Sequence, residues 1–225
     1  MQGEKNEVVE YYDRIAETYD SSRFGGSYGG FIDAQERKLL DNWLPGDGKI
    51  VELACGTGRL TAYATEGVDA SAEMLRQCAA KFPNKPLHCA PGDQLPYADS
   101  SVEAIYCFHL MMHLEKNYIA KVLEECHRVL KPGGVLIFDF PSAKRRKLAR
   151  RNQDGWHGNT AMVLNEVESL APEGLKMTAE RGILFLPIHV LPSSLRRVWL
   201  PLDNLLCRSW LKPWASYTAV KFVKR

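Results

Sequence analysis

Hydrophobic and polar positions alternate with two different periods along the chain, and the period predicts which segments are helices and which are strands. Residues 6–20 and 31–44 place their apolar side chains near one face of a helix. Residues 21–30, between them, contain four glycines, and such a segment favours a flexible link. The first 45 residues are therefore predicted to be two amphipathic helices joined by a link.

From residue 49 onward, short apolar runs alternate with helical patterns. The runs predicted as strands are 49–54, 66–70, 86–93, 101–108 and 135–140, and the segments predicted as helices are 59–64, 72–82 and 114–130. Ser71 is placed to cap the second of these helices. Strands joined through helices by short turns predict a parallel sheet of β–α–β units. After residue 141 we expect a short helix over 162–171 and two long final strands, 175–187 and 216–224.

Composition narrows the class of protein without changing this picture. The 225 residues, 45% of them hydrophobic and 25% charged, suit a single globular domain. A net charge of +2 is too small to imply a nucleic-acid partner by itself. The six cysteines are scattered without a CxxC pair, the first residues are polar, and the apolar run 182–192 is too short for a membrane span. We expect reduced thiols and a cytoplasmic location.

The loop Ala54–Gly58, which follows the first predicted strand, is the first candidate binding site. Gly56 and Gly58 let the backbone approach a ligand where a Cβ atom would collide. A phosphate-binding P-loop would need Lys and Ser or Thr after Gly58, where Arg59 and Leu60 stand. A dinucleotide fingerprint would need a small third glycine where Thr61 stands. These exclusions favour a nucleoside without phosphates.

Two acids follow neighbouring predicted strands and suit the same ligand. Asp69 ends the second strand and could accept hydrogen bonds from both ribose hydroxyls. Asp93 follows the third strand and could accept one from an exocyclic adenine amine. The alternatives are a polar strand end for Asp69 and a Gly-Asp turn for Asp93.

Five motifs together resemble one family. They are YYDRIAETYD, VELACGTGR, GVDASAEML, GDQLPYADSSVEAIYCFHLMMHL and RVLKPGGVLIFDF, which occur in this order over residues 8–141. In this order they are similar to the class I S-adenosylmethionine-dependent methyltransferases, in the small-molecule branch (methyltransferase type 11) that includes the ubiquinone and menaquinone methyltransferases. The resemblance implies S-adenosyl-L-methionine as cofactor and S-adenosyl-L-homocysteine as product.

The same resemblance implies a fold and a division of the chain. The expected fold is α/β and Rossmann-like, a seven-stranded mixed sheet in the order 3-2-1-4-5-7-6, with the last strand antiparallel and helices on both faces. Residues 1–45 would form a helical lid, and residues 46–225 the methyltransferase domain, with a cap insertion at about 187–214.

Site residues follow from the resemblance position by position. The residues implied to bind the cofactor are Tyr12, Arg23, Glu52, Ala54, Cys55, Gly56, Gly58, Asp69, Ala70, Met74, Asp93, Gln94 and Phe108. A catalytic base is required only if the acceptor must lose a proton, and the candidates are Tyr19, His109 and His113. The spacing of the two histidines also suits a metal pair on a helix. No third ligand is evident in the sequence nearby, so we expect packing or acceptor binding for them and no metal.

Two departures from the family pattern carry predictions of their own. Ala54 stands where the family has its first glycine, so we expect a negative φ there. Gly58 and Asp69 lie only eleven positions apart, which leaves too little chain for a full helix and a full strand. We therefore expect the helix at 59–64 to have two turns or fewer and the second strand three or four residues.

The function expected from these observations is methyl transfer to a small hydrophobic acceptor, quinone-like or lipid-like, by in-line displacement. The insertion carries Trp199, Trp210 and Trp214 among basic residues, which suits either a packed cap or contact with a membrane surface through 196–214. The basic run 144–151 is either a solvated face or a docking surface for RNA or a protein substrate. A cofactor-binding protein without catalysis is the other alternative; nucleic acid is not favoured, and no oligomeric state is predicted.

Overall fold

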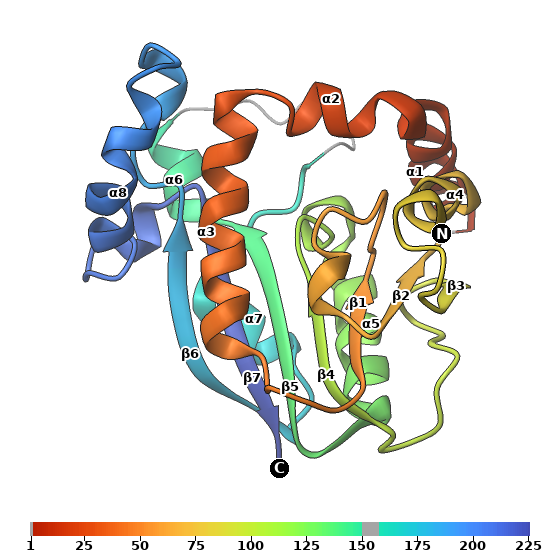
Figure 1. Cartoon of the computed structure of the whole chain (residues 1–225). Coiled ribbons are helices and arrows are strands. Elements are labelled where there is room, and N and C mark those ends of the chain that lie inside the picture. The colour runs from red at the N-terminus through yellow and green to blue at the C-terminus, as the bar shows by residue number, and fades with distance from the viewer. Residues whose placement is uncertain (1, 150–157) are drawn as a thin grey trace.

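The central sheet has the predicted order. The computed structural model describes residues 2–149 and 158–225, and its seven strands pair as β3-β2-β1-β4-β5-β7-β6 (Figure 1). β7 runs antiparallel to both β5 and β6, and the other pairs are parallel. The strands are β1 Ile50–Leu53, β2 Glu66–Asp69, β3 Leu87–Cys89, β4 Val102–Cys107, β5 Leu130–Pro141, β6 Leu175–Ile183 and β7 Tyr217–Lys224.

Helices cover both faces of this sheet. Those described are α1 Gln2–Ile15, α2 Tyr19–Arg23, α3 Ser27–Trp43, α4 Ala72–Lys81, α5 Lys116–Val129, α6 Ala143–Leu148, α7 Leu164–Leu170 and α8 Leu200–Leu206. One hydrophobic cluster joins α5 and α7 to the sheet, and a second joins α3 to the opposite face. The expected α/β layer arrangement is therefore confirmed.

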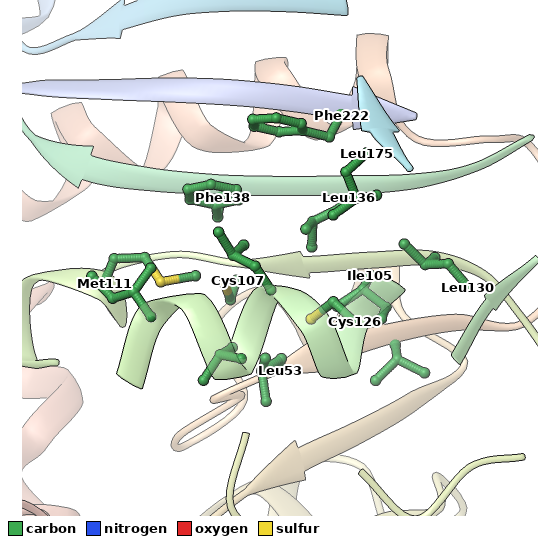
Figure 2. Close-up of a cluster of buried hydrophobic side chains, with 14 of the residues drawn as sticks. Leu53, Ile105, Cys107, Met111, Cys126, Leu130, Leu136, Phe138, Leu175 and Phe222 are labelled. Carbon is green, nitrogen blue, oxygen red and sulfur yellow. The ribbon is translucent and has the colours of Figure 1, made fainter. Parts of the chain in front are cut away.

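The cluster under α5 shows why the middle strands are apolar throughout. β5 is buried on both faces, so VLIFDF reads as a nearly continuous hydrophobic run. Phe138 on β5 stacks on Phe222 of β7 with ring centroids 5.7 Å apart, and Cys107 and Cys126 lie on the other side of Phe138 (Figure 2). All six cysteines are free thiols, and five of them are buried.

The first crossover is as short as the spacing predicted. Between the glycine loop and β2 there is only a single 3₁₀ turn, Thr61–Tyr63, and β2 has four residues. The expected helix over 59–64 is thus reduced to this one turn. Thr65 returns directly to β1, where its N–H donates to the Ile50 carbonyl at 2.7 Å. The ammonium of Lys85 donates to the carbonyls of Thr61 and Ala64, two acceptors of this turn.

The prediction of a flexible link over 21–30 is wrong. α2 continues to Arg23 and α3 begins at Ser27, so only three residues separate the two helices. A Cβ atom on Gly29 would lie 2.5 Å from the Arg23 carbonyl oxygen and from the Phe24 Cα. This glycine therefore permits a close contact between the two helices. From the sequence alone, a glycine needed for such a contact looks the same as one in a flexible link.

α1 and α2 lie across the edge of the sheet where the parallel strands end (Figure 1). This edge holds the carboxyl ends of β1, β2, β4 and β5, where open α/β sheets bind their ligands. The insertion between β6 and β7 contains α8 and three 3₁₀ turns. Within residues 2–149 and 158–225, no helix has both the length and the apolar character needed to cross a membrane.

Candidate functional site

Three residues of the glycine loop, the segment Ala54–Gly58 that follows β1, have a left-handed backbone. Ala54, Gly56 and Gly58 have φ values of +54°, +53° and +88°. The expectation of a negative φ at Ala54 is therefore wrong: the turn requires a left-handed backbone at this position even though a side chain is present. Alanine adopts this conformation at a cost of about 1–2 kcal/mol.

The two glycines serve different purposes. A Cβ atom on Gly56 would meet no atom of the described chain within 4 Å, so this position faces open space. A Cβ atom on Gly58 would lie 2.8 Å from the sulfur of Cys78 and 3.1 Å from the Phe82 ring. Gly58 is thus required for packing on α4, and Gly56 leaves room for a ligand against the backbone.

Asp69 lies beside this open position. Its carboxylate accepts hydrogen bonds from the N–H of Gly56 and the N–H of Ser71, each at 2.8 Å. Burial raises the pKa of the Asp69 carboxyl, and the backbone N–H groups of Ser71, Gly56 and Ala70 oppose that rise. A carboxylate has about four acceptor sites, so Asp69 keeps the capacity to accept from a ligand hydroxyl. The short crossover therefore does not displace the acid from the loop.

Glu52 and Cys55 lie beneath the loop. The Thr61 hydroxyl donates to Glu52, and burial raises the pKa of the Glu52 carboxyl to about 8. Cys55 is buried beside Cys78 and Leu75. Both side chains support the turn from below, and the surface of the loop is left to its backbone.

The residues expected around an adenine ring gather at the ends of β2 and β3. Ser71 caps α4 as predicted, with Oγ accepting from the Met74 N–H at 3.1 Å. Ala70 and Gln94 are exposed, and Met74 is buried beneath the cap. Asp93 accepts a hydrogen bond from the Tyr118 hydroxyl at 2.5 Å. Tyr118 on α5 thus holds the Asp93 side chain in place. A residue that served only to form a turn would not need this contact.

Side chains of α1 and α2 are tied to both sides of the loop. The Asp13 carboxylate accepts from the Ser71 hydroxyl. The Asp20 carboxylate accepts from the Thr57 hydroxyl at 2.5 Å and pairs with Lys81, whose ammonium also reaches the Thr57 carbonyl at 2.7 Å. These contacts hold α1 and α2 over the glycine loop, which is part of the connection from β1 to β2.

Tyr12, Tyr19 and His113 converge beneath these helices. The ring of Tyr12 lies 5.9 Å from that of Tyr19 and 5.7 Å from that of His113, both edge to face. Burial raises the pKa of both tyrosines. Arg23 is exposed and donates to the Tyr11 hydroxyl at 3.2 Å. Two of the three base candidates, Tyr19 and His113, thus lie against the same ring, that of Tyr12.

Hydrogen bonding assigns the tautomer of His113. The Gly158 N–H donates to His113 Nδ1 at 3.3 Å, so Nε2 carries the proton and faces the Tyr12 hydroxyl at 2.9 Å. Met111–His113 form a 3₁₀ turn, so His109 and His113 do not share a helix face as a metal pair would.

The Tyr12–His113 contact gives a prediction for the mobility of α1. Tyr12→Phe removes this contact, which we expect to contribute about 1 kcal/mol. Amide hydrogen exchange over residues 8–23 should accelerate about fivefold. Tyr11→Phe is the matched control, because its partner Arg23 is exposed and such pairs stabilise little. Unchanged exchange in Tyr12→Phe would show that the contact does not hold the helix.

His109 belongs to a second, buried group of charges. Its Nε2 lies 2.7 Å from Glu36 Oε1 on α3, and its Nδ1 lies 3.5 Å from Asp139 Oδ2 on β5. Burial lowers the pKa of His109, but the charges of Glu36 and Asp139 outweigh burial and the net pKa is raised. Arg59 pairs with Glu36 at 2.6 Å and with Asp33 at 2.8 Å.

The sequence did not reveal this group, because its members come from separate elements. Glu36 shares the buried face of α3 with Ile32, Leu39 and Leu40, and Asp139 is the single acid in the run VLIFDF. A lone acid inside a buried apolar pattern was the only available signal. Phe108, the last residue before His109, is buried against α3 and the sheet.

The insertion is anchored to α3 by buried polar contacts. Gln35 donates to Asp203 at 2.8 Å and accepts from the Leu184 N–H at 2.9 Å. Asp203 also accepts from the Leu186 N–H at 2.6 Å. The Gln35 and Asp203 side chains are almost fully buried. α8 is thereby held beside α3, near the ends of β5 and β6.

The basic run 144–151 is only partly available to a partner. Arg146 donates to the carbonyls of Gly158 and Asn159, and Lys144 lies 5.5 Å from the ring centroid of Trp214. Arg150 and Arg151 lie outside the described residues. The contacts of Arg146 and Lys144 within the chain do not favour this run as a docking surface for RNA.

Comparison with known proteins gives consistent findings. A family model described as a methyltransferase domain matches residues 51–138. An uncharacterised protein of Methanocaldococcus jannaschii is 30% identical over 95% of this chain and 89% of its own length. A ubiquinone/menaquinone biosynthesis C-methyltransferase of Campylobacter jejuni is 27% identical to this chain. The matching region covers 59% of this chain and 63% of that enzyme.

A solved structure extends the likeness to the whole fold. It is an S-adenosylmethionine-dependent methyltransferase of Thermotoga maritima, described as a possible histamine N-methyltransferase. The two structures agree with a TM-score of 0.70 over 96% of this chain and 99% of that one, at 17% identity. This likeness concerns the fold alone.

Proposed function

The chain belongs to the class I S-adenosylmethionine-dependent methyltransferases, and we propose that it methylates a small hydrophobic acceptor of quinone-like or lipid-like character. The observation that carries the proposal is the open backbone at Gly56 beside the Asp69 carboxylate. The name of the similar Campylobacter jejuni enzyme supports a quinone-like acceptor.

The residues at the strand ends fit the cofactor. Asp69 would hold the ribose hydroxyls, Gly56 and Cys55 would lie under the adenosine, and Asp93 would accept from the adenine amine. Glu52 would support the loop near the methionine amine. When bound, the cofactor supplies an electrophilic methyl group on a sulfonium.

The chain itself aligns the cofactor with the acceptor and excludes water from the site. α1 and α2 are the lid in this proposal, closed by Asp13 on Ser71 and by Asp20 on Thr57. α3 packs on the sheet core, so only the part of residues 1–45 before it is free to open. Aligning two reactants in a site without water supplies most of the acceleration that such a transfer needs.

We assign a positioning role to the Tyr12–His113 pair. The Nε2–H of His113 donates to the Tyr12 hydroxyl oxygen, so the O–H of Tyr12 is directed away from His113 and can donate to an oxygen of the acceptor. Tyr19 lies against Tyr12 and would pack on the acceptor. Both nitrogens of His109 face carboxylates, so we assign this residue to holding the loop after β4.

Transfer of a labelled methyl group tests the proposal. The protein is incubated with S-adenosylmethionine carrying a labelled methyl, together with a short-chain hydroquinone, a phenolic lipid or a purified tRNA. Label in the hydroquinone or lipid is the expected result. Label only in the RNA would contradict the acceptor class. Cofactor binding without label in any acceptor of the three classes would favour the alternative of a non-catalytic binding protein.

The insertion carries an exposed apolar face that suits contact with a membrane surface. Val198, Leu205 and Trp210 are 71%, 65% and 78% exposed. Arg197, next to Val198, and Arg208, between Leu205 and Trp210 in the sequence, are also exposed, whereas Arg196 donates to backbone carbonyls of the insertion. Apolar and basic side chains together favour an anionic lipid surface.

We expect the double variant Val198→Ser, Trp210→Ser to bind anionic vesicles at least about tenfold more weakly than the unchanged chain, because burial of each side chain contributes about 1.5–3 kcal/mol. Leu148→Ser is the matched control, since Leu148 is 67% exposed but lies on α6, outside 196–214. Co-sedimentation with vesicles measures the binding. Equal binding of all three proteins would remove this face from the proposal.

A further inference from the structure

Three metal-ligating side chains meet where α3 reaches the ends of β4 and β5. Glu36, His109 and Asp139 each offer one ligand atom, and these atoms all lie within 4.8 Å of one another. We propose that the three residues bind a divalent transition-metal cation. The sequence analysis expected no metal, because no third ligand was evident near His109 and His113. In the structure, Glu36 and Asp139 come to His109 from other elements, and His113 turns to Tyr12.

The carboxylates of this group outnumber the guanidiniums around them. Asp33, Glu36 and Asp139 are opposed by two guanidiniums: Arg59 pairs with Asp33 and Glu36, and Arg37 pairs with Asp33. Neither guanidinium pairs with Asp139, whose carboxylate contacts His109. Buried charge without compensation is strongly unfavourable, and a divalent cation neutralises it.

The ligand atoms themselves lack satisfactory partners. Glu36 and Asp139 are 0% and 1% exposed. Among the described residues, no group makes an aligned hydrogen bond to either oxygen of Glu36, to His109 Nε2 or to Asp139 Oδ2. The Glu36 oxygens are close to His109 Nε2 at 2.7 Å and to Arg59 at 2.6 Å as ion pairs, whereas Asp139 Oδ2 lies 3.5 Å from His109 Nδ1 and has the weakest partner. Atoms that converge in this way suit an ion held between them.

The neighbouring contacts leave the required atoms available. Arg59 pairs with Glu36 Oε2, which leaves Oε1 on the side of His109. The backbone N–H of His109 donates to Asp139 Oδ1 at 2.6 Å, which fixes the left-handed backbone of His109 (φ +60°). The other oxygen, Oδ2, faces the His109 ring. The His109 side chain is 17% exposed, so an ion can reach the group along it.

The donor set indicates which cation would bind. One imidazole and two carboxylates suit Mn²⁺, Fe²⁺ or Zn²⁺ better than Ca²⁺, which prefers oxygen ligands alone. A protonated organic amine is the competing ligand. Its bulk disfavours it, because both carboxylates are buried and only 17% of the His109 side chain is exposed.

Titration with Mn²⁺ alone tests the site, since Mn²⁺ does not favour the thiols of the chain. The chelator-treated full chain is titrated by calorimetry, and one saturable Mn²⁺ per chain is expected. Glu36→Gln and Asp139→Asn should each weaken binding at least about tenfold. Asp33→Asn is the matched control, because Asp33 shares Arg59 but does not face His109, and it should bind as the unchanged chain does.

Paramagnetic broadening of ring signals in the unchanged chain locates the ion without any variant. Tyr217 should broaden first, since its ring lies 5.2 Å from that of His109, and His88 should not. Absence of saturable binding, unchanged affinity in both folded variants, or broadening centred on His88 would overturn the proposal. Thermal protection by a primary amine but not by Mn²⁺ would also overturn it. No readout depends on methyl transfer, so the test stands apart from the proposed function.

Discussion

Replacement of Asp69 by alanine should weaken the binding of S-adenosylhomocysteine by at least about 100-fold, or about 2.7 kcal/mol. The carboxylate accepts hydrogen bonds from the N–H groups of Gly56 and Ser71 and keeps acceptor capacity for the ribose hydroxyls. Hydrogen bonds from hydroxyls to a charged acceptor contribute about 1.5–3 kcal/mol each. Isothermal calorimetry with the demethylated product measures the loss directly.

The variant also removes support from the loop, so the two effects must be separated. A 2′-deoxy analogue of the product lacks one of the hydroxyls, and it should lose less affinity than the full product when Asp69 is replaced. Glu66→Gln is the matched control, because Glu66 lies at the opposite end of β2 and pairs with Lys49 and His88. Equal losses for both ligands would mean that Asp69 only shapes the loop.

Gly58→Ala should lower the free energy of unfolding by about 3 kcal/mol, the second large effect. The new Cβ atom would lie 2.8 Å from the Cys78 sulfur, and the backbone has a φ of +88°. Overpacking costs about 1–3 kcal/mol, and a left-handed alanine adds to this. Urea denaturation measures the change.

Gly56→Ala is the matched variant and should behave in the opposite way. Its Cβ atom would meet no atom of the described chain within 4 Å. The free energy of unfolding should therefore fall by only about 1 kcal/mol, because of the backbone strain. The added methyl would instead occupy space above the loop and reduce affinity for S-adenosylhomocysteine. If the two variants lost stability equally and kept the same affinity, the assignment of different purposes to the two glycines would be wrong.

Much of the fold could be predicted because it depends on local pattern. Apolar runs alternating with helices indicated the parallel strands, and the resemblance supplied their order and the antiparallel β7. The spacing between Gly58 and Asp69 also sufficed to predict the short crossover, since the length of a helix is fixed by its number of residues. Ser71 could be identified as a cap from its position alone.

What could not be predicted depends on contacts between distant segments. The left-handed φ of Ala54 is imposed by the path of the turn, whereas the residue type alone favours the opposite sign. The glycines of 21–30 indicated flexibility, but Gly29 allows α3 to pack on the Arg23–Phe24 backbone. Glu36 and Asp139 are 103 positions apart, and no spacing rule joins them to His109.

A crystal structure of the chain with S-adenosylhomocysteine would test the central claim most directly. We expect the adenosine to lie on the backbone of residues 54–58, beneath α1 and α2, with both ribose hydroxyls within hydrogen-bond distance of the Asp69 carboxylate. A product molecule bound elsewhere, or one over the loop with its ribose out of reach of Asp69, would contradict the account.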